Sequence, residues 1–273
     1  MEANTRYVLG TSDAELARLR RQNEALSVET RWLFDRLDLK PGASAVDVGC
    51  GPLGVLELLS QRVGSTGRVV GVDINEVMLR SARQLLDASG HERVELVHAN
   101  ASSTGLERAS FDLVHERLVL INIPQPEVIV REMAALAKPG GVVALAEIDG
   151  VSWCCDPPHP AWEKLYGAFC EVFRRRGCDP NIGRRTARLL RDAGLVDVRV
   201  EFHARSHGSE HVWRNLLLQF TEITRAEAVA SGLLDASEVD GLKAALAAHL
   251  SDPDTTLLSP IVAHAWGRKP LAS

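Results

Sequence analysis

The chain has 273 residues, a formal net charge of -5 and a hydrophobic fraction of 45%, which is the composition of one large globular α/β domain with appendages. The acidic balance excludes a global field that would attract nucleic acid or an anionic membrane. No apolar stretch is long enough for membrane insertion, and the N-terminus lacks the pattern of a signal peptide, so we expect a cytoplasmic protein.

Apolar runs and amphipathic segments alternate through the first 150 residues. Strands are predicted at 44–49, 67–73, 93–98, 111–116 and 142–148, and helices at 55–63, 76–88 and 126–137. The sequence KPGG at 138–141 predicts a turn. Repeated strand–helix units of this length predict a parallel sheet with helices on both faces.

The two ends of the chain depart from this alternation. Near the C-terminus a helix at 187–193 precedes strands at 196–202 and 260–267, and a long helical stretch separates those two strands. We therefore predict an α/β, Rossmann-like fold with a seven-stranded, mostly parallel sheet and an antiparallel edge strand. The predicted divisions are an N-terminal helical lid at 1–40, a main domain at 41–273 and, within it, a helical insertion at 209–252 that caps the substrate site.

A glycine-rich loop follows the first strand, with Gly49, Gly51 and Gly54 at dinucleotide-binding spacing. Taken alone, this spacing also fits a nicotinamide-dependent oxidoreductase. Asp47 argues against that alternative, because a pyrophosphate would lie near its negative charge. A cofactor with a cationic amino-acid tail reverses the sign of this interaction, although Asp47 could also serve only to hold the loop backbone.

Asp73 closes the second strand, where it is placed to accept hydrogen bonds from two ribose hydroxyls. The alternative is that Asp73 caps the helix that follows. The five cysteines form no C-x-x-C pair, and the acids and histidines show no recognisable ligand spacing, so no metal site is predicted.

Four motifs in order resemble those of class I S-adenosylmethionine-dependent methyltransferases. They are VDVGCGP at 46–52, GVD at 71–73, FDLVH at 111–115 and LAKPGG at 136–141. The sequence is most similar to the branch of ubiquinone and menaquinone methyltransferases, which includes many bacterial natural-product enzymes. The core of the resemblance covers about residues 40–150.

This resemblance implies S-adenosyl-L-methionine as the cofactor and methyl transfer by in-line displacement as the reaction. It places the methionine part against the first glycine loop, the ribose on Asp73 and the adenine near the loop after the third strand. The cofactor-binding residues that it implies are Tyr7, Asp47, Gly49, Cys50, Gly51, Asp73, Ile74, Asn100, Ala101 and His115.

A general base is needed only where the acceptor must lose a proton. His115 is the candidate catalytic residue, because its strand ends beside the cofactor. Candidate substrate-binding residues are Glu116, Asp149, Trp153, His207 and Trp213, which follow the later strands or lie near the insertion. Structural packing is the alternative role for each of them.

The predicted function is methyl transfer to a small, largely apolar molecule in bacterial secondary metabolism. The alternatives are a cyclisation or rearrangement that uses the same cofactor without methyl transfer, and the NAD-dependent oxidoreductase. Arginine clusters at 174–176 and 184–185 are interpreted as a solvated helix face, not an RNA site. The oligomeric state stays open, with a homodimer that exchanges the amphipathic N-terminal helix as one option.

Overall fold

The computed structural model describes residues 13–204, 206–207 and 212–271. The first half of the chain contains α1 (Asp13–Ala25), α2 (Ser27–Leu37), β1 (Ser44–Val48), α3 (Leu56–Val63), β2 (Arg68–Asp73), α4 (Glu76–Ala88), β3 (Glu95–His98), β4 (Phe111–Arg117), η1 (Leu120–Asn122) and α5 (Pro126–Leu136). The second half contains β5 (Ala137–Asp149), η2 (Gly150–Ser152), β6 (Cys154–Asp156), α6 (Pro160–Arg175), η3 (Ile182–Arg185), α7 (Thr186–Asp192), β7 (Val196–His203), β8 (Ser206–His207), η4 (Val212–Asn215), α8 (Leu216–Ala230), α9 (Val239–Ser251), β9 (Thr256–Leu258) and β10 (Ile261–Arg268).

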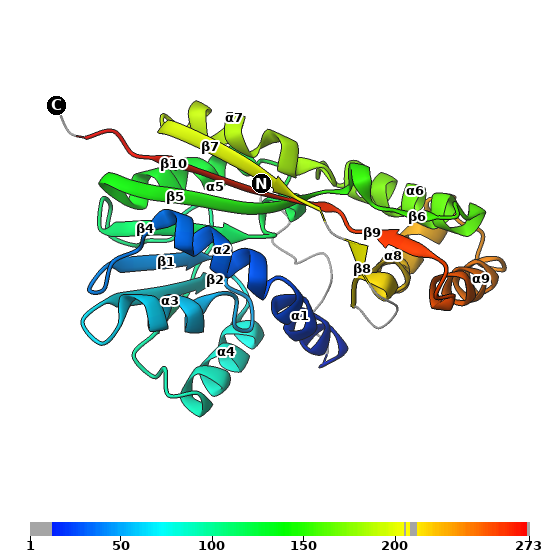
Figure 1. Ribbon diagram of the computed structural model, residues 1–273, viewed down its shortest axis with the longest axis horizontal. Coiled ribbons are helices and arrows are strands. Elements are labelled where there is room, and N and C mark those ends of the chain that lie inside the picture. The colour runs from blue at the N-terminus through cyan, green and yellow to red at the C-terminus, as the bar shows by residue number, and fades with distance from the viewer. Residues whose placement is uncertain (1–12, 205, 208–211, 272–273) are drawn as a thin grey trace.

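A seven-stranded sheet with the order β3-β2-β1-β4-β5-β10-β7 runs through the centre of the fold (Figure 1). Strands β1 to β5 of this sheet pair with one another in parallel. Strand β10 runs antiparallel to both β5 and β7. The predicted seven-stranded, mostly parallel sheet is confirmed, and its antiparallel strand lies one position inside the edge strand β7.

Helices cover both faces of this sheet. On one face α2, α3 and α4 bury Leu33, Phe34, Leu56 and Leu59, among others, in a core with alternate residues of the central strands. On the other face α5 and α7 pack on the opposite set of strand residues. The strands are apolar on both faces, as parallel strands covered by helices require.

The predicted turn at KPGG is part of strand β5. The pairing of β4 with β5 moves from Phe111–Ala137 to Leu113–Val142, so the longer β5 segment bulges out of register. The backbone of Lys269 holds this bulge, because it accepts from the Gly140 N–H and donates to the Gly141 carbonyl, both at 2.9 Å. The turn residues therefore bend a continuous strand without ending it.

A second layer of structure extends beyond one end of the sheet (Figure 1). It consists of α6, α8, α9 and a three-stranded sheet with the order β6-β9-β8, and we call these elements the cap. Helices α8 and α9 fall inside the predicted insertion at 209–252. Helix α6 precedes it in the chain and was not predicted, although His159 caps it and its apolar residues recur at helical spacing.

Candidate functional site

The carboxyl ends of β1 and β4 meet where the strand order reverses. From β1 the chain builds the sheet outward through β2 and β3, and then returns to place β4 on the other side of β1. Loops at such a point diverge and leave room for a ligand between them. The glycine loop, the tip of β2 and the end of β4 all lie at this position.

The glycine loop is held to β2 by its backbone. The Gly49 and Cys50 N–H groups both donate to the Val72 carbonyl, at 2.7 and 3.0 Å. Gly49 and Gly51 have φ angles of 74° and 58°, which other residues rarely adopt. A Cβ at Gly49 would lie 2.4 Å from Val119 Cγ2, whereas a Cβ at Gly51 would meet nothing within 4 Å. The loop is thus closed on the Gly49 side and open at Gly51.

Asp73 borders this open side. Its Oδ2 accepts from the Gly51 N–H at 2.9 Å and its Oδ1 from the Asn75 N–H at 2.8 Å, so each oxygen keeps acceptor capacity. Burial raises the pKa of the Asp73 carboxyl. Helix α4 is capped by Asn75, whose side chain accepts from the Val77 and Met78 N–H groups. The carboxylate is therefore not used as the helix cap.

Ile74 stands beside Asp73 with 38% of its surface exposed, which is unusual for a large apolar side chain. Across from it, Asn100 Oδ1 accepts from both the N–H and the hydroxyl of Ser102 at 2.9 Å. The side-chain carbonyl of Asn100 thus closes its own turn. A role for Asn100 or Ala101 at an adenine ring stays a prediction.

Asp47 and His115 form a buried pair between β1 and β4. They are register partners on the two strands, and His115 Nδ1 lies 2.8 Å from Asp47 Oδ1. The second carboxylate oxygen accepts from the Val55 N–H at 3.4 Å. A Cβ at Gly54 would come within 2.4 Å of that oxygen, so only glycine fits there. The acid holds the far end of the glycine loop and is itself oriented by the imidazole.

His115 has no exposed surface, and its ring meets Phe34 of α2 edge-on at a centroid distance of 5.2 Å. Among the described residues, its Nε2 has no hydrogen-bond partner. Cys50 is also buried, and burial together with Asp47 and Asp73 raises the pKa of its thiol well above the usual value. Its Sγ points to the Gly51 carbonyl at 3.6 Å. Cys50 therefore contributes its backbone to the loop, and its thiol is not placed to act as a nucleophile.

Arg117 joins the N-terminal helices to this loop, a function that the sequence did not suggest. Its guanidinium donates to Thr30 Oγ1 at 2.9 Å, to Asn23 Oδ1 at 2.5 Å and to the Gly54 carbonyl at 3.4 Å. Burial lowers the pKa of the guanidinium, while Asp47, Glu116 and Glu29 act in the opposite direction. Helices α1 and α2 are thereby fixed over the carboxyl end of β1.

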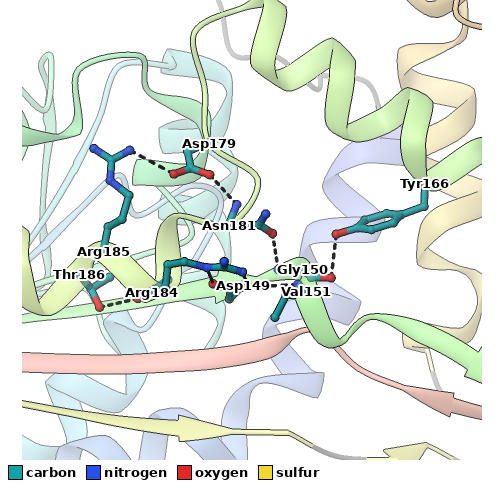
Figure 2. Close-up of polar contacts among 10 residues, drawn as sticks. Asp149, Gly150, Val151, Tyr166, Asp179, Asn181, Arg184, Arg185 and Thr186 are labelled. Carbon is teal, nitrogen blue, oxygen red and sulfur yellow. Dashed lines mark hydrogen bonds and ion pairs between the residues drawn. The ribbon is translucent and has the colours of Figure 1, made fainter. Parts of the chain in front are cut away.

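The candidate substrate residues on β4 and β5 are already engaged by the protein. Glu116 is fully buried and accepts from the Val119 N–H at 3.1 Å. Asp149 is held by Arg184 through two contacts of 2.5 and 2.6 Å, and its Oδ1 also accepts from the Val151 N–H. Figure 2 shows this ion pair at the end of β5.

The same network ties the cap to the sheet. The Gly150 N–H donates to Asn181 Oδ1 at 3.1 Å, and the Tyr166 hydroxyl of α6 donates to the Gly150 carbonyl at 2.7 Å (Figure 2). A Cβ at Gly150 would lie 2.2 Å from that hydroxyl. Asp149 thus lies at the junction between β5 and the cap, and its role in substrate binding stays a prediction.

The remaining candidates are divided between the core of the cap and the undescribed segments. Trp153 is 3% exposed and contacts Trp162, Tyr166, Phe169 and Phe220. Trp213 is 4% exposed and, with Arg18, Gln22 and Leu216, lines a cavity of about 10 Å³ between α1 and the cap. Tyr7 and the side chain of His207 lie outside the described residues.

The arginine clusters that could have suggested RNA binding are paired with acids. Arg174 and Arg175 contact Glu171, and Arg176 contacts Glu227. Arg184 and Arg185 contact Asp149 and Asp179. Where the chain is described, no helix has the length and apolarity to cross a membrane, and no group of His, Cys, Asp or Glu side chains is arranged to hold a metal.

The residues at the switch point fit the cofactor that the motifs imply. Asp73 retains acceptors for ribose hydroxyls, Ile74 exposes an apolar face for a base, and the space beside Gly51 is open. The buried carboxylate of Asp47 would supply a negative charge near a cationic amino-acid tail. These residues would hold S-adenosylmethionine, whose sulfonium supplies an electrophilic methyl group when it is bound.

Comparisons with known proteins show similarity to methyltransferases. Residues 46–145 match the family model of the methyltransferase domain. The demethylmenaquinone methyltransferase of Bacillus cereus is 39% identical over 111 residues, which are 41% of this chain and 47% of that protein. The chain therefore spans about half the length of the curated relative that it matches.

Solved structures share the fold at low identity. Phosphoethanolamine N-methyltransferase 2 of Haemonchus contortus with S-adenosyl-L-methionine has a TM-score of 0.56 at 18% identity, over 89% of this chain and 52% of that chain. The [4+2]-cyclase SpnF has a TM-score of 0.55 at 20% identity, over 91% and 83%. Residues 46–145 thus match a methyltransferase domain, and this part of the chain is similar to the demethylmenaquinone methyltransferases.

Proposed function

We propose that this protein transfers the methyl group of S-adenosylmethionine to a small, largely apolar molecule in bacterial secondary metabolism. The observation that carries the proposal is the buried Asp47 carboxylate, held by His115 beside the glycine loop. Such an acid repels a pyrophosphate and attracts the ammonium of an amino-acid tail. It therefore favours adenosylmethionine over a nicotinamide dinucleotide.

Each group at the switch point has a distinct task in this proposal. Asp73 accepts from the ribose hydroxyls, Ile74 contacts the adenine, and Asp47 acts on the ammonium of the methionine part. His115 orients Asp47 from a position sealed under α2, so its contribution is to cofactor positioning and not to proton removal from an acceptor. Methyl transfer then depends mainly on alignment of the acceptor with the methyl group.

The acceptor site is assigned to the region between the N-terminal helices and the cap. Arg18 of α1 lies over the Phe220 ring of α8 at 5.3 Å, so the two layers meet there. Aromatic and aliphatic side chains dominate this part of the cap, which suits an apolar acceptor. Because the Bacillus relative is named for demethylmenaquinone, quinones and the hydroxylated aromatic compounds formed by their reduction are the first acceptor class to test.

The test has a binding step and a reaction step. Calorimetry should show that S-adenosylhomocysteine binds the purified protein and that NAD does not. Labelled S-adenosylmethionine and a panel of hydroxylated aromatics should then yield labelled product together with adenosylhomocysteine. Binding of NAD without binding of adenosylhomocysteine would overturn the proposal.

A cyclisation or rearrangement is the second candidate, because a [4+2]-cyclase has the same fold. Product formation without adenosylhomocysteine would favour it over methyl transfer. The proposal also includes a cytoplasmic location, no nucleic-acid partner and a homodimer as the open option for assembly. Light scattering of the purified protein decides the assembly.

A further inference from the structure

Two glutamates are buried together at the carboxyl ends of β4 and β5. Glu116 and Glu147 each have no exposed surface, and one oxygen of each, Glu116 Oε1 and Glu147 Oε2, has no hydrogen-bond partner among the described residues. A protonated carboxyl group can donate to a carboxylate, so one proton between these two oxygens would satisfy both. Two ionised carboxylates at this depth would repel each other in a medium of low dielectric constant. Retention of one proton by the pair would relieve this repulsion.

The other oxygens of the pair hold the chain that leaves β4. Glu116 Oε2 accepts from the Val119 N–H at 3.1 Å. Glu147 Oε1 accepts from the Leu120 N–H at 2.5 Å and the Ile121 N–H at 3.4 Å. These amides precede or begin the short helix η1, where no backbone carbonyl is available to accept from them. Two side chains from neighbouring strands thus satisfy three consecutive donors.

The segment held in this way lies against the glycine loop. Leu118 has a φ angle of 58°, a conformation that is unfavourable for a branched side chain and so needs support from its surroundings. The next residue, Val119, is the side chain that would meet a Cβ at Gly49 at 2.4 Å. The position of the two glutamates therefore sets how closely Val119 covers the first glycine of the loop.

We propose that Glu116 and Glu147 act as one proton-sharing positioning pair. By holding the backbone of residues 119–121, the pair keeps Val119 against Gly49 and so shapes the site for the methionine part of the cofactor. The inference rests on the proposed function, because it assigns these residues a role at that same cofactor site. Neither glutamate contacts substrate in this view. Burial and the charge of Glu147 raise the pKa of Glu116 well above the usual value, and burial raises the pKa of Glu147, in keeping with a retained proton.

The pair predicts a pattern that a role in packing alone would not produce. Glutamine at position 116 can donate its amide to Glu147 and accept from the Val119 N–H, so Glu116→Gln should keep affinity for S-adenosylhomocysteine within about threefold of wild type. Glu116→Ala and Glu147→Ala should each weaken it by at least about tenfold, because loop amides lose their acceptors. The double alanine variant should lose no more affinity than the single alanine variant that binds less tightly, because both side chains act through one loop.

Hydrogen exchange gives a second readout that needs no ligand. Amides 119–121 should exchange faster in both alanine variants and at the wild-type rate in Glu116→Gln. Glu132→Gln is the matched control, because Glu132 is a buried acid that accepts from Thr104 at 2.7 and 2.9 Å and does not touch this segment. It should change neither the affinity nor the exchange of these amides.

Glu116→Asp replaces the alanine variants if they do not fold, because it keeps the carboxyl but withdraws it by one methylene. It should weaken binding by about fivefold. Wild-type affinity and exchange in the folded alanine or aspartate variants would overturn the pair, as would a Glu116→Gln variant as weak as Glu116→Ala. If wild type itself does not bind adenosylhomocysteine, the proposed function fails, whereas the exchange of amides 119–121 still decides whether the pair holds the loop.

Discussion

Two regions of the molecule bury side chains of different kinds. One is the carboxyl ends of β1 and β4, and the other is the cap. At the strand ends the buried groups are polar and act in pairs, such as Asp47 with His115. In the cap they are aromatic, with Trp153 and Trp162 in edge contact at 5.5 Å. Polar pairs demand particular residues at particular positions. Apolar packing demands mainly volume, which many sequences supply.

This difference explains which region a motif can identify. A cofactor common to many enzymes requires the same charges and glycines each time, so the strand ends carry a recognisable pattern. The acceptor differs between enzymes, and the cap that faces it is built from interchangeable apolar residues. The contrast predicts that cap variants alter stability first and that strand-end variants alter cofactor affinity first.

The largest effect is expected in the cap. Trp153→Ala removes a side chain that is 3% exposed, and large-to-small changes of this kind cost about 3–5 kcal/mol in the free energy of unfolding. Affinity for S-adenosylhomocysteine should stay within about threefold of wild type. Urea denaturation and calorimetry measure the two quantities, with Trp153→Phe as the milder control. Lost affinity in a protein of unchanged stability would contradict the division between the two regions.

The next effect belongs to the strand ends. Asp47→Asn keeps an acceptor for His115 but removes the negative charge, so affinity for S-adenosylhomocysteine should fall about 100-fold, or about 2.7 kcal/mol. The free energy of unfolding should change by less than about 1 kcal/mol, because the replacement is nearly isosteric. Glu132→Gln serves as the control for loss of a buried acid. Undiminished affinity in Asp47→Asn would remove the acid from cofactor recognition.

A pH effect tests how α2 is seated on the sheet. His264 is 1% exposed and lies under Trp32 at a centroid distance of 5.6 Å, and burial is the main cause that lowers its pKa from 6.5 to about 3. Between these two values the unfolded chain binds a proton that the folded chain does not, so stability falls as pH falls below about 6.5.

The free energy of unfolding should therefore drop by about 1 kcal/mol between pH 7.5 and pH 5.5. A single histidine can contribute at most about 1.4 kcal/mol for each pH unit below the pKa of the unfolded chain. His264→Leu should remove this part of the slope. Denaturant titrations at the two pH values measure it for both proteins. An equal slope in His264→Leu would show that other groups cause the acid sensitivity.

The smallest effect concerns the junction between the regions. Tyr166→Phe removes one hydrogen bond to the Gly150 carbonyl, which should cost about 1 kcal/mol in unfolding free energy. Cofactor affinity should not change, because Gly150 lies at the end of β5 on the side of the cap. Thermal denaturation and calorimetry check both statements. A large loss of affinity would mean that the cap junction and the cofactor site are coupled.

Much of the fold and the cofactor end could be predicted because their signals are local. Asp73 follows its strand directly, and Gly49 and Gly51 occupy positions that require positive φ. The boundaries of strands and helices up to residue 137 follow from apolar periodicity. Helix α6 also carries such a signal, in Trp162, Leu165 and Phe169 at helical spacing after Pro160.

The sequence by itself determined the class of sheet, the position of the glycine loop and the two acids that favour an adenosylmethionine cofactor, because each depends on neighbours a few residues apart. Only the tertiary structure decided that His115 is sealed against Asp47, that Arg117 ties α1 and α2 to the loop, and that Glu116 and Glu147 hold the same segment after β4. The contacts of His115 and Arg117 join residues 63 to 94 positions apart, and the pairing of strands that creates them is a property of the whole sheet. The same carboxylate can bind a ligand or hold a loop, and its neighbours in space determine which.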